Sequence, residues 1–145
     1  MVSDLHYSTR PFRSRDSSKV FEALYDAVEE EKPNLVLSAG DFGEEATEEM
    51  FRPICKRKYF LTIYGNHDNI ELIKSLRNED GSPCWLSNGH VREWQGLKIA
   101  AINGNIALKK RKSHHHTPKE VERLIEVYKK NGVDILVTHE APKHI

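Results

Sequence analysis

Short apolar runs alternate with amphipathic stretches along the chain, and this alternation is typical of an α/β fold. The apolar runs favour strands because they are short and are followed by polar turns. Gln95-Gly96 separates two of these runs and predicts a hairpin. The predicted strands cover residues 35–38, 59–64, 91–94, 97–102 and 134–138.

Helices are predicted where apolar residues recur at the spacing of one helical face. The clearest begins at Thr117, because Thr117-Pro118-Lys119-Glu120 combines a capping box with proline at the first helical position. Asn131-Gly132 ends this helix. Pro53 is expected to interrupt or bend another. The predicted helices cover residues 18–32, 45–56, 70–77 and 117–131.

Composition narrows the class of protein. A length of 145 residues favours a single domain, residues 1–145, that can bury a core of its own. Acidic and basic residues balance at 22 each, so net charge does not indicate a polyanionic partner. Cys55 and Cys84 lack metal-ligand spacing and are expected to be free thiols in a reducing cytosol. With no membrane span and no signal peptide in the sequence, a cytoplasmic location is expected.

Four apolar runs end in side chains of the kinds that bind metals. In open α/β sheets, ligands bind at the carboxyl ends of the strands, so these side chains are expected to converge in one crevice. Carboxylate, imidazole and amide groups together suit a divalent metal such as Mn²⁺, Fe²⁺ or Zn²⁺. The residues are Asp4 and His6, then Asp41, then Asn66 with His67 and Asp68, and last His139.

The order of these residues along the chain is more specific than any one of them. Asp4-Leu5-His6, Gly40-Asp41, Gly65-Asn66-His67-Asp68 and His139 occur in the order found in calcineurin-like metallophosphoesterases. The chain resembles that family over nearly its whole length, in the small type without a cap domain. The resemblance implies a layered sandwich of two mixed β-sheets flanked by α-helices. The first four strands and their helices are expected to form one half, and the hairpin begins the other.

The resemblance also implies a dinuclear metal site. Asp4 and His6 would hold the first metal ion, and Asn66 and His139 the second, with Asp41 as the bridge. A carboxylate suits the bridge because its charge screens two cations that lie only ~3.5–4 Å apart.

The same resemblance implies hydrolysis of phosphomonoesters or phosphodiesters by attack of a metal-bridging hydroxide. His67 would assist the leaving group, and Asp68 would fix the orientation of His67. The expected substrate is a phosphorylated small molecule or a nucleic-acid-like phosphodiester. The pattern specifies neither the oligomeric state nor which metal is used.

One part of the family pattern has no counterpart in the chain. After the position of His139 the family continues to a Gly-His-x-His turn that supplies two further ligands, and His144 lacks this context. Only three residues precede Asp4. We therefore expect the domain to be incomplete at both ends, and we do not expect these residues alone to hold two metal ions. A binding module without turnover is the alternative to an enzyme.

A basic cluster precedes the last helix. Lys109, Lys110, Arg111 and Lys112 are followed by three histidines, which form a poor preformed metal site. The cluster suits either a solvated loop or a loop that binds a nucleic acid backbone, and the second reading makes a nuclease an alternative function. Arg10 and Arg13 could bind a substrate phosphate, although plain surface positions are equally consistent with the sequence.

Overall fold

The computed structural model describes residues 1–10 and 17–140. Arg13 and His144 lie outside them. Four helices and seven strands occur within these residues. The helices are α1 (Val20–Glu31), α2 (Glu48–Arg57), α3 (Ile70–Ser75) and α4 (Pro118–Asn131). The strands are β1 (Leu35–Ser38), β2 (Tyr59–Thr62), β3 (Arg92–Trp94), β4 (Leu97–Ile102), β5 (Asn105–Ile106), β6 (His115–His116) and β7 (Ile135–Thr138).

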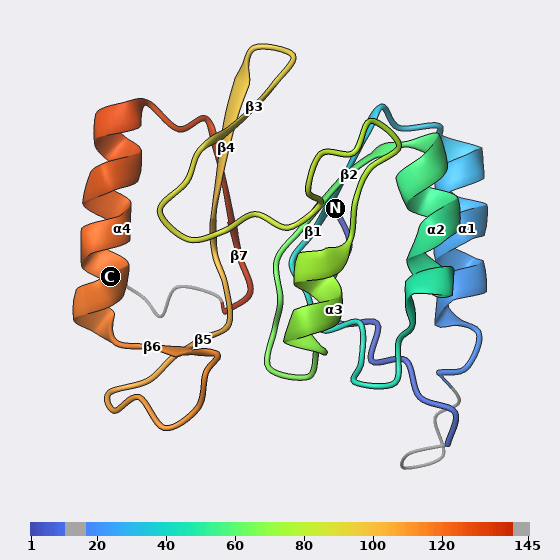
Figure 1. Ribbon diagram of the computed structural model, residues 1–145, viewed down its shortest axis with the longest axis horizontal. Helices are drawn as coiled ribbons and strands as arrows, with labels where there is room; N and C mark the ends of the chain where they lie inside the picture. The colour runs from blue at the N-terminus through green and yellow to red at the C-terminus, as the bar shows by residue number, and fades with distance from the viewer. Residues whose placement is uncertain (11–16, 141–145) are drawn as a thin grey trace.

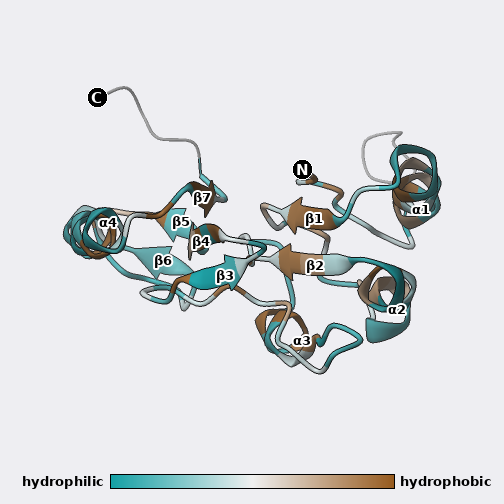
Figure 2. Ribbon diagram, turned by 90° about the horizontal axis from the view of Figure 1, so that it is seen from above, coloured by the Kyte–Doolittle hydropathy of each residue, from teal (hydrophilic) through white to brown (hydrophobic). Residues whose placement is uncertain are grey.

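The elements form layers in the order helices, sheet, sheet, helix (Figure 1). Helices α1 and α2 cover the outer face of the β1–β2 sheet, and α4 covers the outer face of the β3–β4–β7 sheet (Figure 2). This arrangement confirms the predicted layered α/β sandwich. Within the described residues, no helix is long and apolar enough to cross a bilayer.

The two sheets differ in strand direction. Strands β1 and β2 are parallel, and Val2 and Trp85 add parallel bridges to Ser38 and Thr62. The second sheet is mixed, because β3 and β4 form the predicted antiparallel hairpin while β7 runs parallel to β4. Parallel neighbouring strands need a crossover connection, and α4 lies in the crossover between β4 and β7. These three elements form a βαβ unit that adds β7 to the sheet of the hairpin.

Each layer boundary buries its own apolar cluster. Successive residues of β4 point to opposite faces, so Ile99 and Ala101 pack between the sheets while Ala100 and Ile102 pack against α4. Four phenylalanines fill the boundary between the first sheet and its helices. They are Phe21, Phe42, Phe51 and Phe60.

Two local details differ from the sequence prediction. Pro53 lies inside α2, which continues to Arg57 because Phe51, Ile54 and Cys55 bury its inner face and compensate for the hydrogen bond that proline cannot donate. The basic cluster lies between two short strands, β5 and β6, whose parallel pairing was not predicted. This pairing brings the two ends of the 107–114 loop together, so the basic residues lie in a loop that is closed at its base.

The caps of α2 and α4 provide a matched test of the predicted capping box. The Thr117 side chain accepts a hydrogen bond from Glu120 N–H, and the Glu120 carboxylate accepts one from Thr117 N–H. The Thr47 side chain makes no cap bond at α2. Thr117→Ala is expected to lower the free energy of unfolding by about 1 kcal/mol. Thr47→Ala should change it by much less. Urea unfolding of both variants measures the difference, and equal losses would contradict the assigned cap.

Candidate metal centre

The candidate centre forms where the N-terminal segment runs beside the extension of β1. Val2 pairs with the end of β1, and the same pairing then continues past the strand. Asp4 N–H donates to Gly40 O at 3.0 Å, and His6 N–H donates to Asp41 O at 2.9 Å. The two segments therefore bring Asp4 and His6 next to Asp41, as the strand-end prediction requires.

Three of the predicted ligands adopt a left-handed backbone. The φ angles are 56° at Asp4, 47° at His6 and 60° at Asp41. This conformation costs roughly 1–2 kcal/mol for a residue with a side chain. Strained residues of this kind persist where the surroundings hold them, and they cluster at functional sites. Lys32 and Gln95 have the same conformation elsewhere, so it is the occurrence of three such residues together that marks this corner of the molecule.

Two glycines allow the loops after β1 and β2 to touch. A Cβ atom on Gly40, whose φ is +87°, would lie 2.5 Å from Gly65 N. A Cβ atom on Gly65 would lie 2.0 Å from Asp41 Oδ1 and 2.6 Å from His139 Cε1. These distances are far below van der Waals contact. Any side chain at Gly40 or Gly65 would therefore push the two loops apart, and one at Gly65 would also displace the Asp41 carboxylate and the His139 ring.

A half-buried carboxylate joins the same two loops. Asp68 Oδ2 accepts hydrogen bonds from Gly65 N–H at 2.7 Å and Asp41 N–H at 2.8 Å, and Oδ1 accepts one from Phe42 N–H at 2.7 Å. Burial raises the pKa of the Asp68 carboxyl, and the three amide hydrogen bonds oppose that rise. Asp68 thus positions the backbone of the candidate centre, while its predicted role in orienting His67 stays a prediction.

One group of possible ligand atoms consists of Asp4, His6 and Asp41. Their ligand atoms all lie within 4.8 Å of one another. His6 Nε2 lies 3.8 Å from Asp4 Oδ1 and 3.7 Å from Asp41 Oδ2. Ligand atoms bound about 2.1 Å from a single ion lie roughly 3.0–3.5 Å apart, so small side-chain movements would let this group close around a cation.

A second group forms on the other side of Asp41. His139 Nε2 lies 3.2 Å from Asn66 Oδ1 and 3.5 Å from Asp41 Oδ2. His139 Nδ1 lies 2.9 Å from Ala39 O, which can only accept, so Nδ1 carries a proton. In the neutral ring Nε2 then presents a lone pair to two acceptor oxygens. Such a cluster suits a cation, and the carbonyl on Nδ1 is the usual second partner of a metal-binding histidine.

The two groups share one oxygen atom. Asp41 Oδ2 is the oxygen near both His6 and His139, while Asp41 Oδ1 accepts the backbone N–H of His67 at 2.9 Å. Asp41 is almost completely buried, with 3% of its surface exposed. A buried carboxylate oxygen between two imidazoles has the position that a bridging ligand needs.

The His67 ring borders the first group from the solvent side. Its centroid lies 5.3 Å from that of His6 at an angle of 72° between the rings. With His6, Tyr7 and Glu44, His67 lines an open hollow of about 270 Å³. The His67 ring therefore borders a hollow next to the candidate ligands, where it could contact a molecule bound at the centre.

A larger cleft of about 470 Å³ lies beside Asn66. It receives Lys74 from α3 and Lys112 and His114 from the loop between β5 and β6. Burial and the neighbouring charges of His115 and Lys112 lower the pKa of His114. Sequence reasoning did not select Lys74, which stands in no motif, and it considered His114 only as part of the basic cluster and not as a residue of the site.

The other predicted substrate residues lie away from the lining of this cleft. Lys110 pairs with Glu120 at 3.4 Å, and its neighbours Lys109 and Arg111 are exposed. Arg10 is exposed as well, and hydrogen bonds from Thr9 together with the nearby charge of Arg10 lower the pKa of Glu45. The predicted substrate contacts of these residues stay predictions.

Asn103 is a structural residue of the site that the sequence prediction missed. Its buried side chain accepts from Tyr64 N–H at 3.0 Å and from Trp85 Nε1–H at 2.9 Å, and it donates to Leu86 O at 2.8 Å. These bonds join the end of β4 to the end of β2. The available signal was Asn103-Gly104, a polar turn after an apolar run like those at the other strand ends.

Comparison with known proteins agrees with the geometry. Residues 1–144 match the model of the family described as calcineurin-like phosphoesterase, which confirms the predicted family. A search of curated proteins gave no match.

The contacts of Asp68 predict a large effect of a small change. In Asp68→Asn the amide group can accept through one atom only, so at least one buried backbone N–H of Asp41, Phe42 or Gly65 loses its partner. The free energy of unfolding is expected to fall by about 2–3 kcal/mol. Urea unfolding without metal measures it, with the exposed Asp26→Asn as the control. Equal stability of the two variants would contradict the tie between the loops.

Proposed function

The chain belongs to the calcineurin-like phosphoesterase family, and we propose that it hydrolyses phosphomonoesters or phosphodiesters at a dinuclear metal centre. Asp4 and His6 would hold one divalent cation and Asn66 and His139 the other, with Asp41 beside both positions. One observation carries this proposal: two groups of ligand-type atoms share Asp41 Oδ2, which lies 3.7 Å from His6 Nε2 and 3.5 Å from His139 Nε2.

The donor atoms fit hard-to-borderline divalent cations. Carboxylate oxygens, an amide oxygen and imidazole nitrogens together suit Mn²⁺, Fe²⁺ or Zn²⁺. When bound, two such cations supply Lewis acidity and lower the pKa of water towards neutrality.

The protein's own residues position and protonate the substrate in this proposal. The His67 ring faces the hollow beside His6 and donates a proton to the oxygen that leaves phosphorus. The backbone N–H of His67 holds Asp41 Oδ1, which keeps Oδ2 directed to the two imidazoles. The cleft next to Asn66 offers room for the alcohol part of the ester, and Lys74 and Lys112 attract its anionic groups.

An open site of this kind admits extended phosphodiesters as well as small monoesters. Four predicted substrate residues are exposed and lie outside the lining of the cleft: Arg10, Lys109, Lys110 and Arg111. They would contact only a substrate long enough to extend beyond the cleft. Hydrolysis rates measured on four substrates therefore distinguish the substrate classes. The substrates are bis-p-nitrophenyl phosphate, p-nitrophenyl phosphate, a cyclic nucleotide and single-stranded RNA.

The first test combines hydrolysis of these four substrates with Mn²⁺ titration of the protein encoded by the complete gene. Calorimetry is expected to give two bound ions per chain, and at least one substrate should be hydrolysed. In Asp41→Asn the left-handed backbone is tolerated and Oδ1 can still accept from His67 N–H, but an amide donor replaces Oδ2. We expect the fold to be kept, at most one ion to bind, and turnover to fall by at least ~10³-fold.

Two results would contradict this proposal in different ways. If wild type binds two Mn²⁺ ions but hydrolyses none of the substrates, the protein is a binding module. If Asp41→Asn binds two ions as tightly as wild type, the shared carboxylate is not the bridge.

The second test separates proton donation from metal binding. His67→Ala keeps the backbone N–H bond to Asp41 and removes only the ring, so Mn²⁺ affinity should not change. Turnover is expected to fall by roughly 10²–10⁴-fold, and more for an alkyl phosphate than for the nitrophenyl ester, whose leaving group needs no proton. The exposed His90→Ala serves as the control. Loss of metal from His67→Ala would show that His67 is a ligand instead.

A further inference from the structure

The cysteines lie in contact although they are far apart in the sequence. Cys55 Sγ lies 3.7 Å from Cys84 Sγ, across a sequence separation of 29 residues. Cys55 is in the last turns of α2, and Cys84 is in the segment between α3 and β3. Both are free thiols, with 6% and 0% of their surfaces exposed. Sequence spacing gave no reason to expect this pairing.

Backbone hydrogen bonds hold the two cysteines in place. Cys84 N–H donates to Leu76 O at 3.1 Å, and Cys84 O accepts from Thr62 N–H of β2 at 2.8 Å. Cys55 O accepts from Glu79 N–H at 3.1 Å, in the same segment as Cys84. These backbone bonds hold the two cysteines beside each other. The sulfur atoms must move from 3.7 Å to about 2 Å apart to form a disulfide.

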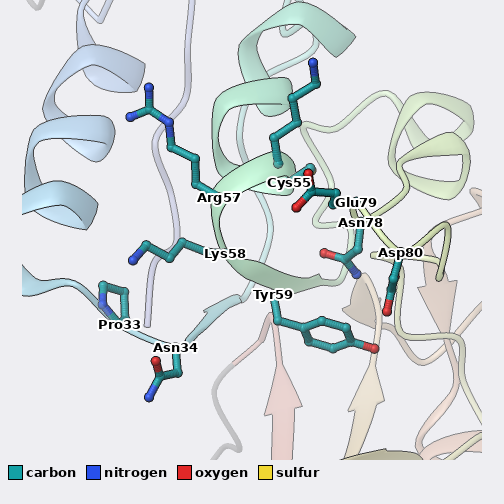
Figure 3. Close-up of a pocket in the computed structure, with 10 residues that line it drawn as sticks. Pro33, Asn34, Cys55, Arg57, Lys58, Tyr59, Asn78, Glu79 and Asp80 are labelled. Atoms are coloured by element: carbon teal, nitrogen blue, oxygen red, sulfur yellow. The ribbon is translucent and has the colours of Figure 1, made fainter.

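Cys55 is the more accessible of the two cysteines. Cys55 lines a surface pocket of about 420 Å³ together with Asn78 and Glu79 (Figure 3). It also lines an adjoining hollow of about 370 Å³. Cys84 lines neither of these two pockets and is fully buried behind Cys55. A small oxidant can therefore approach Cys55 first.

We propose that Cys55 and Cys84 form a peroxide-sensitive dithiol that closes to an intramolecular disulfide. The Cys55 sulfur attacks a hydroperoxide, so an S–O bond forms, the O–O bond breaks and an alcohol or water leaves with a proton. The Cys84 sulfur then attacks the resulting sulfenic acid, loses its proton and expels water. Both thiols are oxidised by one electron each, and the hydroperoxide is reduced by two electrons.

Accessibility assigns the two roles in this order, because Cys55 lines two surface pockets and Cys84 is fully buried. The contact with the Cys84 thiol lowers the pKa of Cys55. The contact with Cys55, together with burial, raises the pKa of Cys84. The more acidic and more accessible thiol is the better first nucleophile, and the protonated buried thiol resolves the intermediate.

The disulfide would tie α2 to the segment that supports β2. Cys84 O and Leu86 N–H both bond to Thr62, the last residue of β2, and the loop that carries Asn66, His67 and Asp68 follows directly. Closing a loop of this length restricts the unfolded chain. The expected consequence is a domain that is more resistant to unfolding under oxidising conditions.

The test treats the metal-free, full-length protein with a small excess of hydrogen peroxide. The intact mass is expected to fall by two hydrogen atoms, a Cys55–Cys84 cross-linked peptide should appear, and neither thiol should react with iodoacetamide after unfolding. The melting temperature is expected to rise by about 10 °C and to return to its starting value with dithiothreitol.

Two variants keep the result interpretable. In Cys84→Ala, Cys55 should gain oxygen atoms under the same treatment and the melting temperature should not rise. In Cys55→Ala, Cys84 should stay reduced because it is buried. Two alkylated thiols, oxygen gain in the wild type, or a disulfide-linked dimer would overturn the proposal. None of these readouts depends on metal binding or hydrolysis, so they leave the proposed function untouched.

Discussion

The half-buried carboxylate of Asp68 is the contact on which the candidate centre depends. It accepts three backbone N–H groups from the loops after β1 and β2. Unpaired, those N–H groups would each cost about 1–3 kcal/mol. The loops can only meet there because Gly40 and Gly65 have no side chains. Removing either the acceptor or the space would separate Asp41 from Asn66.

The same contact explains how the chain holds a strained backbone. Asp41 has a left-handed φ, and its N–H is bound to Asp68 while its C=O accepts from His6. Its carboxylate is held in turn by the N–H of His67. Because the backbone and the carboxylate of Asp41 are already held by hydrogen bonds, the side chain loses little conformational entropy when it binds a cation. That entropy is lost when the protein folds and not when the cation binds. The stability of the layered core therefore supports the affinity of the site.

Sequence patterns predicted the parts of this molecule that local chemistry determines. Strand β1, the β3–β4 hairpin and the cap of α4 follow from residue spacing, and the order of the ligand-type residues indicated the family. The prediction was less successful where distant segments decide the outcome. The interruption expected at Pro53 was outweighed by burial of α2, and neither the β5–β6 pairing nor the inter-sheet bonds of Asn103 have a local signature. The contacts of Asp68 also join residues that are 26 and 27 positions apart.

His139 shows why the second group of ligand atoms needs the whole sandwich. Asp4, His6 and Asp41 are all set by the N-terminal segment and β1, so the first group depends on one sheet. His139 follows β7, which is registered against β4 in the other sheet. It reaches Ala39, Asn66 and Asp41 only because the apolar faces of the two sheets pack on each other. The shared oxygen of Asp41 is thus the point where the geometry of one sheet meets that of the other. Errors in sheet packing would displace the second group while leaving the first intact, and it follows that the inter-sheet core, rather than either sheet alone, sets the distance between the two candidate cation positions.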